Sequence, residues 1–269
     1  MKYRNRTITV LANRIRILSY LFITVVFSIL VFSCNQKNKE NPIIIATAAN
    51  MQEVMEFLIT DFTKKTNIKC QLVVSSSGKL TAQIKAGAPY HILASANMKY
   101  PEEIYDSGLA IGIPKIYANG KLVLWTANTN ITPSIALLKK DNIKHIAIAN
   151  SKTAPYGAAT KDVLEHYNLN EILKHKFVIG ESISQTNQFV HSQAAEIGFT
   201  AMSTILSEKL ENKGKWAAID STTYSPIKQG IVVIKQDLES NRKAKEFYAY
   251  ISSKEAQLLL TKFGYSTHE

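Results

Sequence analysis

The segment Ile43–Phe62, IIIATAANMQEVMEFLITDF, decides the fold class. Its first residues, 43–47, are mostly β-branched or apolar and predict a buried strand. The apolar residues that follow recur at the spacing of one helix face, and they are Met51, Val54, Met55, Leu58, Ile59 and Phe62. A strand that passes into a helix through a few small residues is typical of α/β proteins, whose ligands lie beyond the carboxyl ends of the strands.

The same alternation of strand and helix continues outward along the chain. Further strands are predicted at 72–74, 91–95, 122–125, 146–149, 177–179, 197–200, 216–219 and 231–234. Helices are predicted near 79–86, 101–107, 155–167, 184–191, 204–210, 242–251 and 254–263. Asn119-Gly120 predicts a turn before the strand that starts at Leu122. The sequence shows no internal repeat. Residues 42–269 are enough for one large domain or two smaller lobes.

The N-terminal segment 1–33 predicts a lipoprotein signal peptide. Its first part holds five basic residues and no acidic one, namely Lys2, Arg4, Arg6, Arg14 and Arg16. The apolar run 17–32 is shorter than the about 20 residues that a membrane-spanning helix needs. The run ends in LVFSC at 30–34, which resembles the bacterial lipobox and predicts lipidation of Cys34; an uncleaved anchor helix is the alternative. Residues 34–41 are polar and predict a tether.

Composition argues against several classes of function. Without the five basic residues of the leader, 27 Lys and Arg stand against 21 Asp and Glu, so residues 34–269 carry a net charge of +6. This modest charge does not require nucleic acid as a partner, and export argues against it. With Cys34 lipidated, Cys70 is alone, which leaves no disulfide framework and no Cys/His metal cluster.

Four predicted strands pass directly into helices through short segments of polar or small residues. These junctions are Thr47–Asn50, Ser75–Gly78, Thr153–Gly157 and Glu181–Gln185. The first N–H groups of a helix lack intrahelical partners, and the helix dipole adds about half a positive charge there. Several such helix ends at one point form a cage of neutral donors for an oxyanion. Taken singly, each junction is explained as well by helix capping; Glu53, three residues after Asn50, predicts a capping box.

In amino-acid sequence and in their order along the chain, these stretches resemble the periplasmic molybdate-binding proteins of ATP-driven importers. The resemblance covers about residues 43–265 and rests on segments 47–50, 75–84, 87–89, 120–124, 148–157, 180–185, 195–199 and 262–265. It implies an α/β, two-lobed periplasmic-binding-protein fold (type II), with a mixed sheet flanked by helices in each lobe. Two crossing strands, near 122–125 and 230–233, would join the lobes. Lobe 1 would comprise residues 42–122 and 231–269, and lobe 2 residues 123–230.

The resemblance also implies a binding site. The molybdate-binding positions fall on Asn50, Ser77, Tyr156 and Ile183, with Ala49 and Ser76 as additional contacts. Asn50 and Ser77 would donate through side chain and backbone, and the other two positions through the backbone N–H. Ala201 lacks the tyrosine hydroxyl that some relatives place there, so either one hydrogen bond to the ligand would be missing or Asn50 would supply it. His91 and Asn97 stand where relatives usually carry Asp, outside the binding positions.

The implied function is capture of molybdate or tungstate and its delivery to the permease subunits of an ABC importer in the inner membrane. The protein would be periplasmic and monomeric, held to a membrane by its lipid anchor. It would use no cofactor and no free metal cation, bind no nucleic acid and have no enzyme activity.

Three alternatives remain open at this stage. An exported hydrolase would use Ser77 as its nucleophile, but the six histidines lie in no motif with a positioned carboxylate, and no G-x-S-x-G elbow is present. A binding protein of the same fold could take sulfate or another oxyanion. A sensory lipoprotein would report anion levels without feeding a transporter.

Overall fold

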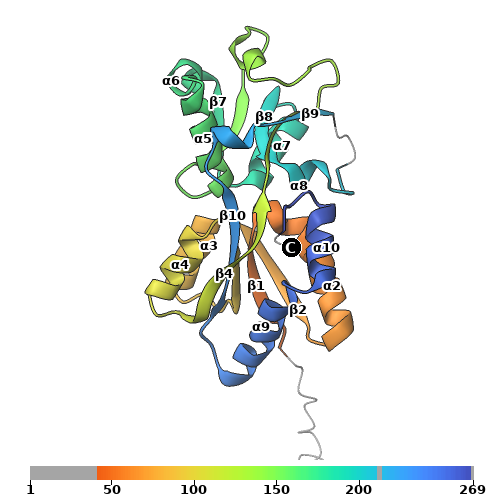
Figure 1. The fold of residues 1–269 in the computed structure, drawn as a ribbon. Coiled ribbons are helices and arrows are strands. Elements are labelled where there is room, and N and C mark those ends of the chain that lie inside the picture. Colours follow the sequence, from red (N-terminus) through yellow and green to blue (C-terminus); the bar gives the residue numbers. More distant parts are fainter. Residues whose placement is uncertain (1–40, 211–213, 268–269) are drawn as a thin grey trace, which may run out of the picture. The chain divides into compact units, whose positions relative to one another are not determined.

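Two five-stranded mixed sheets organise the part of the chain that the computed structural model describes, residues 41–210 and 214–267 (Figure 1). The predicted α/β fold with two sheet-based lobes is therefore confirmed. The predicted signal peptide 1–33, Cys34 and the tether up to residue 40 lie outside the described residues. Within the described ranges, no helix has both the length and the apolar character needed to cross a membrane.

The first lobe is built on a sheet with the strand order β2-β1-β3-β10-β4. Its strands are β1 (Ile43–Ala48), β2 (Cys70–Ser75), β3 (Ile92–Ser95), β4 (Ala110–Gly120) and β10 (Ile227–Ile234). Its helices are α2 (Gln52–Thr66), α3 (Ser77–Lys85), α4 (Lys99–Asp106), α9 (Leu238–Tyr250) and α10 (Lys254–Lys262). Because side chains alternate along β1, Ile43 and Ile45 pack with α2, α9 and α10, while Ala46 packs with α3 and α4 on the other face.

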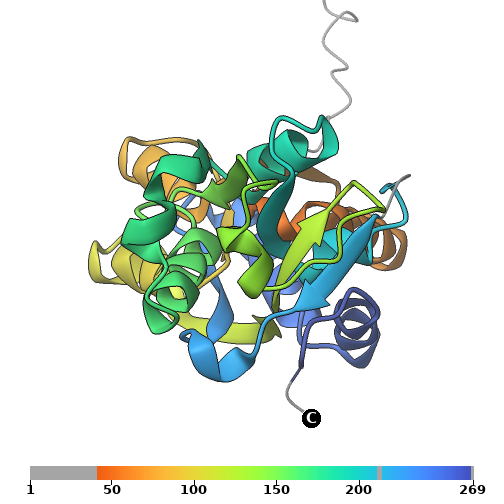
Figure 2. The ribbon, with the colours of Figure 1, turned by 90° about the horizontal axis from the view of Figure 1, so that it is seen from above.

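The second lobe repeats this plan with the strand order β7-β6-β8-β5-β9. Its strands are β5 (Leu122–Thr126), β6 (Ile146–Ala149), β7 (Phe177–Gly180), β8 (Ile197–Ala201) and β9 (Lys215–Ala218). Its helices are α5 (Pro155–His166), α6 (Asn170–Leu173), α7 (Ile183–His191) and α8 (Met202–Ile205), with short 3-10 turns η2 (Ala136–Lys139), η3 (Lys174–Lys176) and η4 (Ser221–Thr223). Leu122 and Leu124 face α5, whereas Val123 and Trp125 face α7, so helices cover both sides of this sheet (Figure 2).

The chain passes twice between the two sheets. The first passage is at Lys121, between β4 and β5, and the second lies in the segment between β9 and β10. The predicted turn at Asn119-Gly120 is wrong, because both residues belong to β4. No strand is predicted over β4, which contains Pro114, and proline argues against a strand. Proline is tolerated there because β4 is an edge strand with register shifts against β10.

The predicted helix 204–210 is also wrong. Helix α8 is a single turn that ends at Ile205. The following residues turn instead toward α2 of the first lobe, where the Glu208 N–H donates to Glu53 Oε1 at 3.0 Å. A tertiary contact has thus replaced the local helical pattern.

His91 joins the starts of two neighbouring strands. Its Nδ1 accepts the Ile44 N–H at 2.8 Å, and its own N–H donates to Ile44 O at 2.9 Å. Burial lowers the pKa of the imidazole, and the nearby Asp237 carboxylate opposes this shift. A neutral His91 therefore supplies the acceptor that the strand end needs.

We expect His91 to make folding stability depend on pH. Because its folded-state pKa is lower than the usual value of about 6.5, the unfolded chain binds the proton first as pH falls. His91 therefore adds no pH dependence above pH ~6.5, and stability is lost as pH falls from there through the folded-state pKa. The free energy of unfolding, measured by urea titration between pH 7.5 and 5, should fall less steeply in His91→Asn, whose amide oxygen still accepts the Ile44 N–H. Equal slopes in both proteins would contradict this role.

Gly157 allows the first turn of α5 to approach the end of β6. A Cβ at this position would lie 2.3 Å from Ala149 O, a backbone atom that cannot rotate away. Gly→Ala in an exposed helix interior usually stabilises by about 0.5–1 kcal/mol. Here we expect Gly157→Ala to destabilise by about 1–3 kcal/mol in chemical denaturation, because overpacking outweighs helix propensity. Ala158→Gly, at the next and exposed position, is the control and should cost only about 1 kcal/mol.

Candidate functional site

The residues that the sequence singled out come together at one small cavity between the two lobes. Its lining includes all six predicted contacts, Ala49, Asn50, Ser76, Ser77, Tyr156 and Ile183. They come from the carboxyl ends of β1 and β2 in the first sheet and of β6 and β7 in the second. Each sheet thus contributes two strand-to-helix junctions to the cavity.

The cavity is small and lined by neutral groups. Its volume is about 10 Å³, near the minimum that admits one water molecule. Among the described residues that line it there is no Lys, Arg, His, Asp or Glu. Four further small residues complete the wall of the cavity: Ala48, Ala96, Ala154 and Pro155. The sequence analysis did not name them as ligand contacts. Their place in the sequence could have indicated them, because each lies at the end of a strand or the start of a helix, where a small side chain lets the backbone approach.

Two serines of the first lobe face the cavity at the start of α3. Ser76 is the N-cap residue, yet its side chain makes no capping hydrogen bond. Its Oγ is buried and has no hydrogen-bond partner within the described part of the chain. Ser77 Oγ accepts the Ala96 N–H at 3.0 Å, which leaves its own proton to be donated elsewhere. Both hydroxyls are therefore available to a ligand that accepts hydrogen bonds.

The second lobe contributes the first turns of α5 and α7. Pro155 opens α5 and places Tyr156 in the first turn, where backbone N–H groups have no intrahelical acceptor. Ile183 begins α7, and the N-cap Ser182 Oγ accepts the Gln185 N–H at 3.4 Å. The Ser182 hydroxyl therefore accepts the N–H of Gln185 and not that of Ile183. Tyr156 and Ile183 thus each provide a backbone N–H donor that does not depend on the identity of the side chain.

The Tyr156 side chain does not take part in this donor role. Its hydroxyl packs against the passage between the lobes, within 2.1 Å of where a Cβ on Gly120 would lie. Burial raises the pKa of this phenol well above its usual range, so it stays neutral. Gly120 is needed there because any larger residue would occupy the space of the Tyr156 ring.

Asn50 is placed at the cavity, but its side chain is engaged elsewhere. Its Nδ2 donates to Gln229 Oε1 at 2.9 Å and to the Tyr265 hydroxyl at 2.8 Å. Both amide hydrogens are thereby used, so the expectation that the Asn50 side chain donates to the ligand does not hold in this geometry. Its backbone remains at the cavity wall. Ala201 ends β8 without a polar side chain, and Asn50 is not free to replace the donor missing there.

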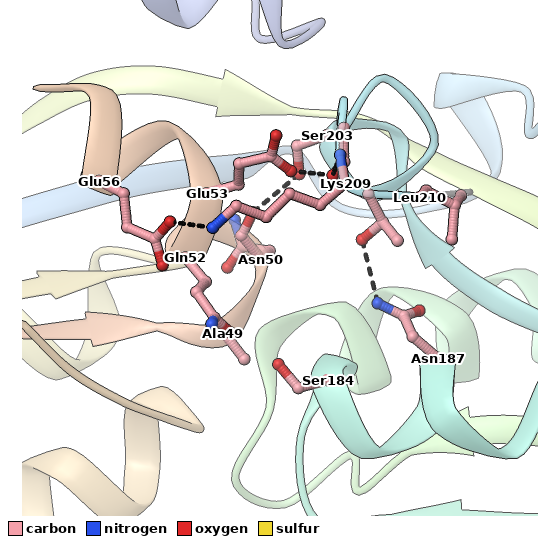
Figure 3. Close-up of a pocket in the computed structure, with 12 residues that line it drawn as sticks. Ala49, Asn50, Gln52, Glu53, Glu56, Ser184, Asn187, Ser203, Lys209 and Leu210 are labelled. Atoms are coloured by element: carbon pink, nitrogen blue, oxygen red, sulfur yellow. Dashed lines mark hydrogen bonds and ion pairs between the residues drawn. The ribbon is translucent and has the colours of Figure 1, made fainter. Parts of the chain in front are cut away.

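Next to the cavity lies a larger hollow of about 250 Å³, shown in Figure 3. Its walls come from α2 of the first lobe and from α7, α8 and residues 207–210 of the second. Glu53 bonds Ser207 Oγ and the Glu208 N–H, and Glu56 pairs with Lys209, whose pKa this carboxylate raises. The predicted capping box at Asn50 is therefore wrong, because Glu53 reaches across to the other lobe.

A second set of contacts joins the lobes on the side of α3 and α4. The Gly78 N–H donates to Thr153 O at 2.9 Å, and the Tyr100 hydroxyl donates to Lys152 O at 3.1 Å. Polar contacts between the lobes therefore lie on both sides of the cavity.

The described residues of the cavity lining offer hydrogen-bond donors but no general base. Ser77, the nucleophile candidate of the hydrolase alternative, bonds a backbone N–H, and the described lining holds neither a histidine nor a carboxylate. Activation of a serine needs such a base within hydrogen-bond reach. The arrangement is suited to holding an anion and gives the hydrolase alternative no support.

Comparison with known proteins agrees with this geometry. Residues 43–266 match the family model of the bacterial extracellular solute-binding proteins. The molybdate-binding protein ModA of Rhodobacter capsulatus is 34% identical over 84% of this chain and 88% of its own. The Bacillus subtilis protein YvgL, a putative substrate-binding lipoprotein of an ABC transporter, is 27% identical over 87% of this chain and 90% of its own.

A solved structure supports the same relationship. The periplasmic molybdate-binding protein of Azotobacter vinelandii superposes with a TM-score of 0.80 and 32% sequence identity, over 84% of this chain and all of that one. The resemblance inferred from the sequence is thus confirmed, and the chain belongs to the family of bacterial extracellular solute-binding proteins.

Proposed function

We propose that this protein captures molybdate or tungstate in the cavity between its lobes and delivers the anion to the permease of an ABC importer. The observation that carries the proposal is the set of neutral donors at the cavity, from the starts of α3, α5 and α7 and the hydroxyls of Ser76 and Ser77. The ModA relatives support the choice of ligand, and the solute-binding family supports a transport role rather than catalysis.

The chemistry of the donors favours an unprotonated dianion. A protonated anion would bring a donor to a cavity with few acceptors, and an unmatched buried donor is costly. Molybdate and tungstate carry no proton at neutral pH, whereas phosphate is partly protonated. Sulfate has the same charge and shape, so cavity size alone separates it from molybdate. Sulfate is therefore the second candidate ligand.

Binding and closure of the lobes are one event in this proposal. A cavity of about 10 Å³ has to widen before a tetrahedral oxyanion enters. Because its walls come from both lobes, a rotation about the two passages between the sheets widens it without breaking either sheet. The anion then stabilises the closed form through contacts that only this form offers. Asn50, Ser76 and Ser77 act from the first lobe, and Tyr156 and Ile183 from the second.

We further propose export to the periplasm, with Cys34 as the lipid attachment site. The extracellular family and the lipoprotein among the relatives support this, together with the lipobox-like LVFSC at 30–34. We propose two lobes close to the expected bounds, 42–122 with 231–269 and 123–230, except that β5 from Leu122 belongs to the second lobe and all of β10 from Ile227 to the first. We also propose that the protein is monomeric.

Thermal melting against a panel of oxyanions tests the ligand. A ligand that binds only the folded protein stabilises it by about 2.7 kcal/mol at a hundredfold excess over its Kd. For a chain of this size that corresponds to a rise in Tm of roughly 5–10 °C. We expect this rise with molybdate and tungstate and little change with sulfate or phosphate. A sulfate shift equal to that of molybdate would overturn the assignment to molybdate.

The role of Ser76 is tested by comparing two hydroxyl deletions. Ser76→Ala removes a buried hydroxyl that bonds nothing in the described structure, so the Tm without ligand should not fall. A hydrogen bond to a charged group contributes about 1.5–3 kcal/mol, so molybdate affinity measured by calorimetry should drop about tenfold or more.

Thr47→Val is the matched control for this experiment. Thr47 Oγ1 is equally buried and also lacks a partner among the described residues, but it does not line the cavity. We expect unchanged molybdate affinity in this variant. Equal losses in both variants would show that Ser76 acts through general packing and does not contact the anion.

A further inference from the structure

A closed ring of hydrogen bonds surrounds Asn50 at the wall of the anion cavity. Asn50 Nδ2 donates to the Tyr265 hydroxyl at 2.8 Å, which lies 3.1 Å from Ser203 Oγ. Ser203 Oγ in turn donates to Asn50 O at 2.8 Å. Figure 3 shows Ser203 beside Asn50, where α8 of the second lobe meets the start of α2. All three residues are buried.

The protons of this ring are fully assigned. Each hydroxyl has one proton to donate. Ser203 gives its proton to Asn50 O, and Tyr265 shares its own between Ser203 Oγ and Asn50 O, the latter at 2.9 Å. Burial raises the pKa of the Tyr265 phenol, so this proton is kept at neutral pH. The ring is therefore a fully satisfied buried network, which holds its members in one arrangement.

The ring has a second anchor in the first lobe. The other amide hydrogen of Asn50 goes to Gln229 Oε1, and Gln229 Nε2 donates to Ala96 O at 3.3 Å. Asn50 and Ala96 both line the anion cavity. Gln229 and Tyr265 thus fix the first-lobe side of the wall whatever the second lobe does.

Ser203 is the one member of this ring that belongs to the second lobe. Tyr265 packs in the core of the first lobe, with β1 and α2, whereas Ser203 lies on α8 beyond β8 of the second sheet. The Ser203 contacts cross between the lobes, so they break when the lobes part, while the bonds from Asn50 to Tyr265 and Gln229 remain.

We propose that Ser203 and Tyr265 are positioning residues that couple closure of the lobes to the orientation of Asn50 at the anion site. The inference rests on the proposed function, because it assigns these residues a role in holding the anion. In the closed form, Ser203 fixes the carbonyl of Asn50 and Tyr265 fixes its side chain. The backbone of residue 50 is then set for the ligand. On opening, the carbonyl loses its Ser203 donor and the anion is released.

Stopped-flow kinetics with molybdate test this proposal on the purified full-length protein. Because the Ser203 contacts exist only in the closed form, Ser203→Ala and Tyr265→Phe should each raise the dissociation rate about fivefold to tenfold. The association rate should stay within about twofold, since encounter precedes closure. The dissociation rate of the double variant Ser203→Ala/Tyr265→Phe should be little higher than that of the more affected single variant, because both hydroxyls act in one ring.

Tyr117→Phe is the matched control. Tyr117 is as buried as Tyr265 and packs in the same core, but its hydroxyl has no partner within residues 41–210 and 214–267. Its removal should leave both rates unchanged. A merely structural role of Tyr265 would lower the Tm or the fraction of active protein, and would not raise the dissociation rate selectively.

The outcomes separate this inference from the proposed function. If the unsubstituted protein binds neither molybdate nor tungstate, the proposed function falls and this inference falls with it. If the unsubstituted protein binds molybdate but Ser203→Ala and Tyr265→Phe match Tyr117→Phe, the inference alone is overturned. Ser203→Ala keeps the test decisive even if Tyr265→Phe folds poorly, because Ser203 lies outside the first-lobe core.

Discussion

Backbone N–H groups without intrahelical partners are the constraint around which the site is built. The helices α3, α5 and α7 begin at one small cavity, and each beginning leaves donors that the helix itself cannot satisfy. A buried donor without an acceptor costs free energy comparable to a lost hydrogen bond. The protein itself satisfies two of these donors, because Thr153 O accepts the Gly78 N–H and Ser182 Oγ accepts the Gln185 N–H. The proposed anion, with acceptors on every side and no donor, would satisfy donors that remain. Because the helices belong to two different sheets, it would do so only when both lobes close around it.

Charge is kept out of the cavity and placed beside it. Within the described lining every residue is neutral, whereas the neighbouring hollow holds Glu53, Glu56 and Lys209. A cation in the cavity would bind many anions by charge alone, and directed neutral donors discriminate by geometry and protonation instead. The carboxylates of α2 act on the protein, since Glu53 binds the Glu208 N–H and Glu56 pairs with Lys209. The charged contacts between the lobes thus lie outside the cavity.

The sequence predicted the four junctions at the cavity because their signals are local. A strand pattern that passes into a helix pattern locates these junctions without knowledge of the fold, whereas the individual positions Ser76, Ser77, Tyr156 and Ile183 came from the resemblance to molybdate-binding proteins. The role of Asn50 could not be predicted in the same way. Its amide partners, Gln229 and Tyr265, are 179 and 215 residues away in the sequence, and the pattern of a capping box competes with them. β4 was missed for the opposite reason, because Pro114 is a strong local signal that the edge of a sheet tolerates.

The two sets of contacts between the lobes differ in how far they depend on side chains that a substitution can remove. Beside α3, the contact from the Gly78 N–H to Thr153 O joins two backbone groups, and only the Tyr100 contact depends on a side chain. Beside α2, the contacts depend on Glu53 and Ser203, and a single substitution removes either one. Stability of the closed form can therefore vary among sequences through α2 and α8 while the donor cage stays the same. In the proposed function only the closed form offers the full cage, so affinity would follow closure as well as the cage itself.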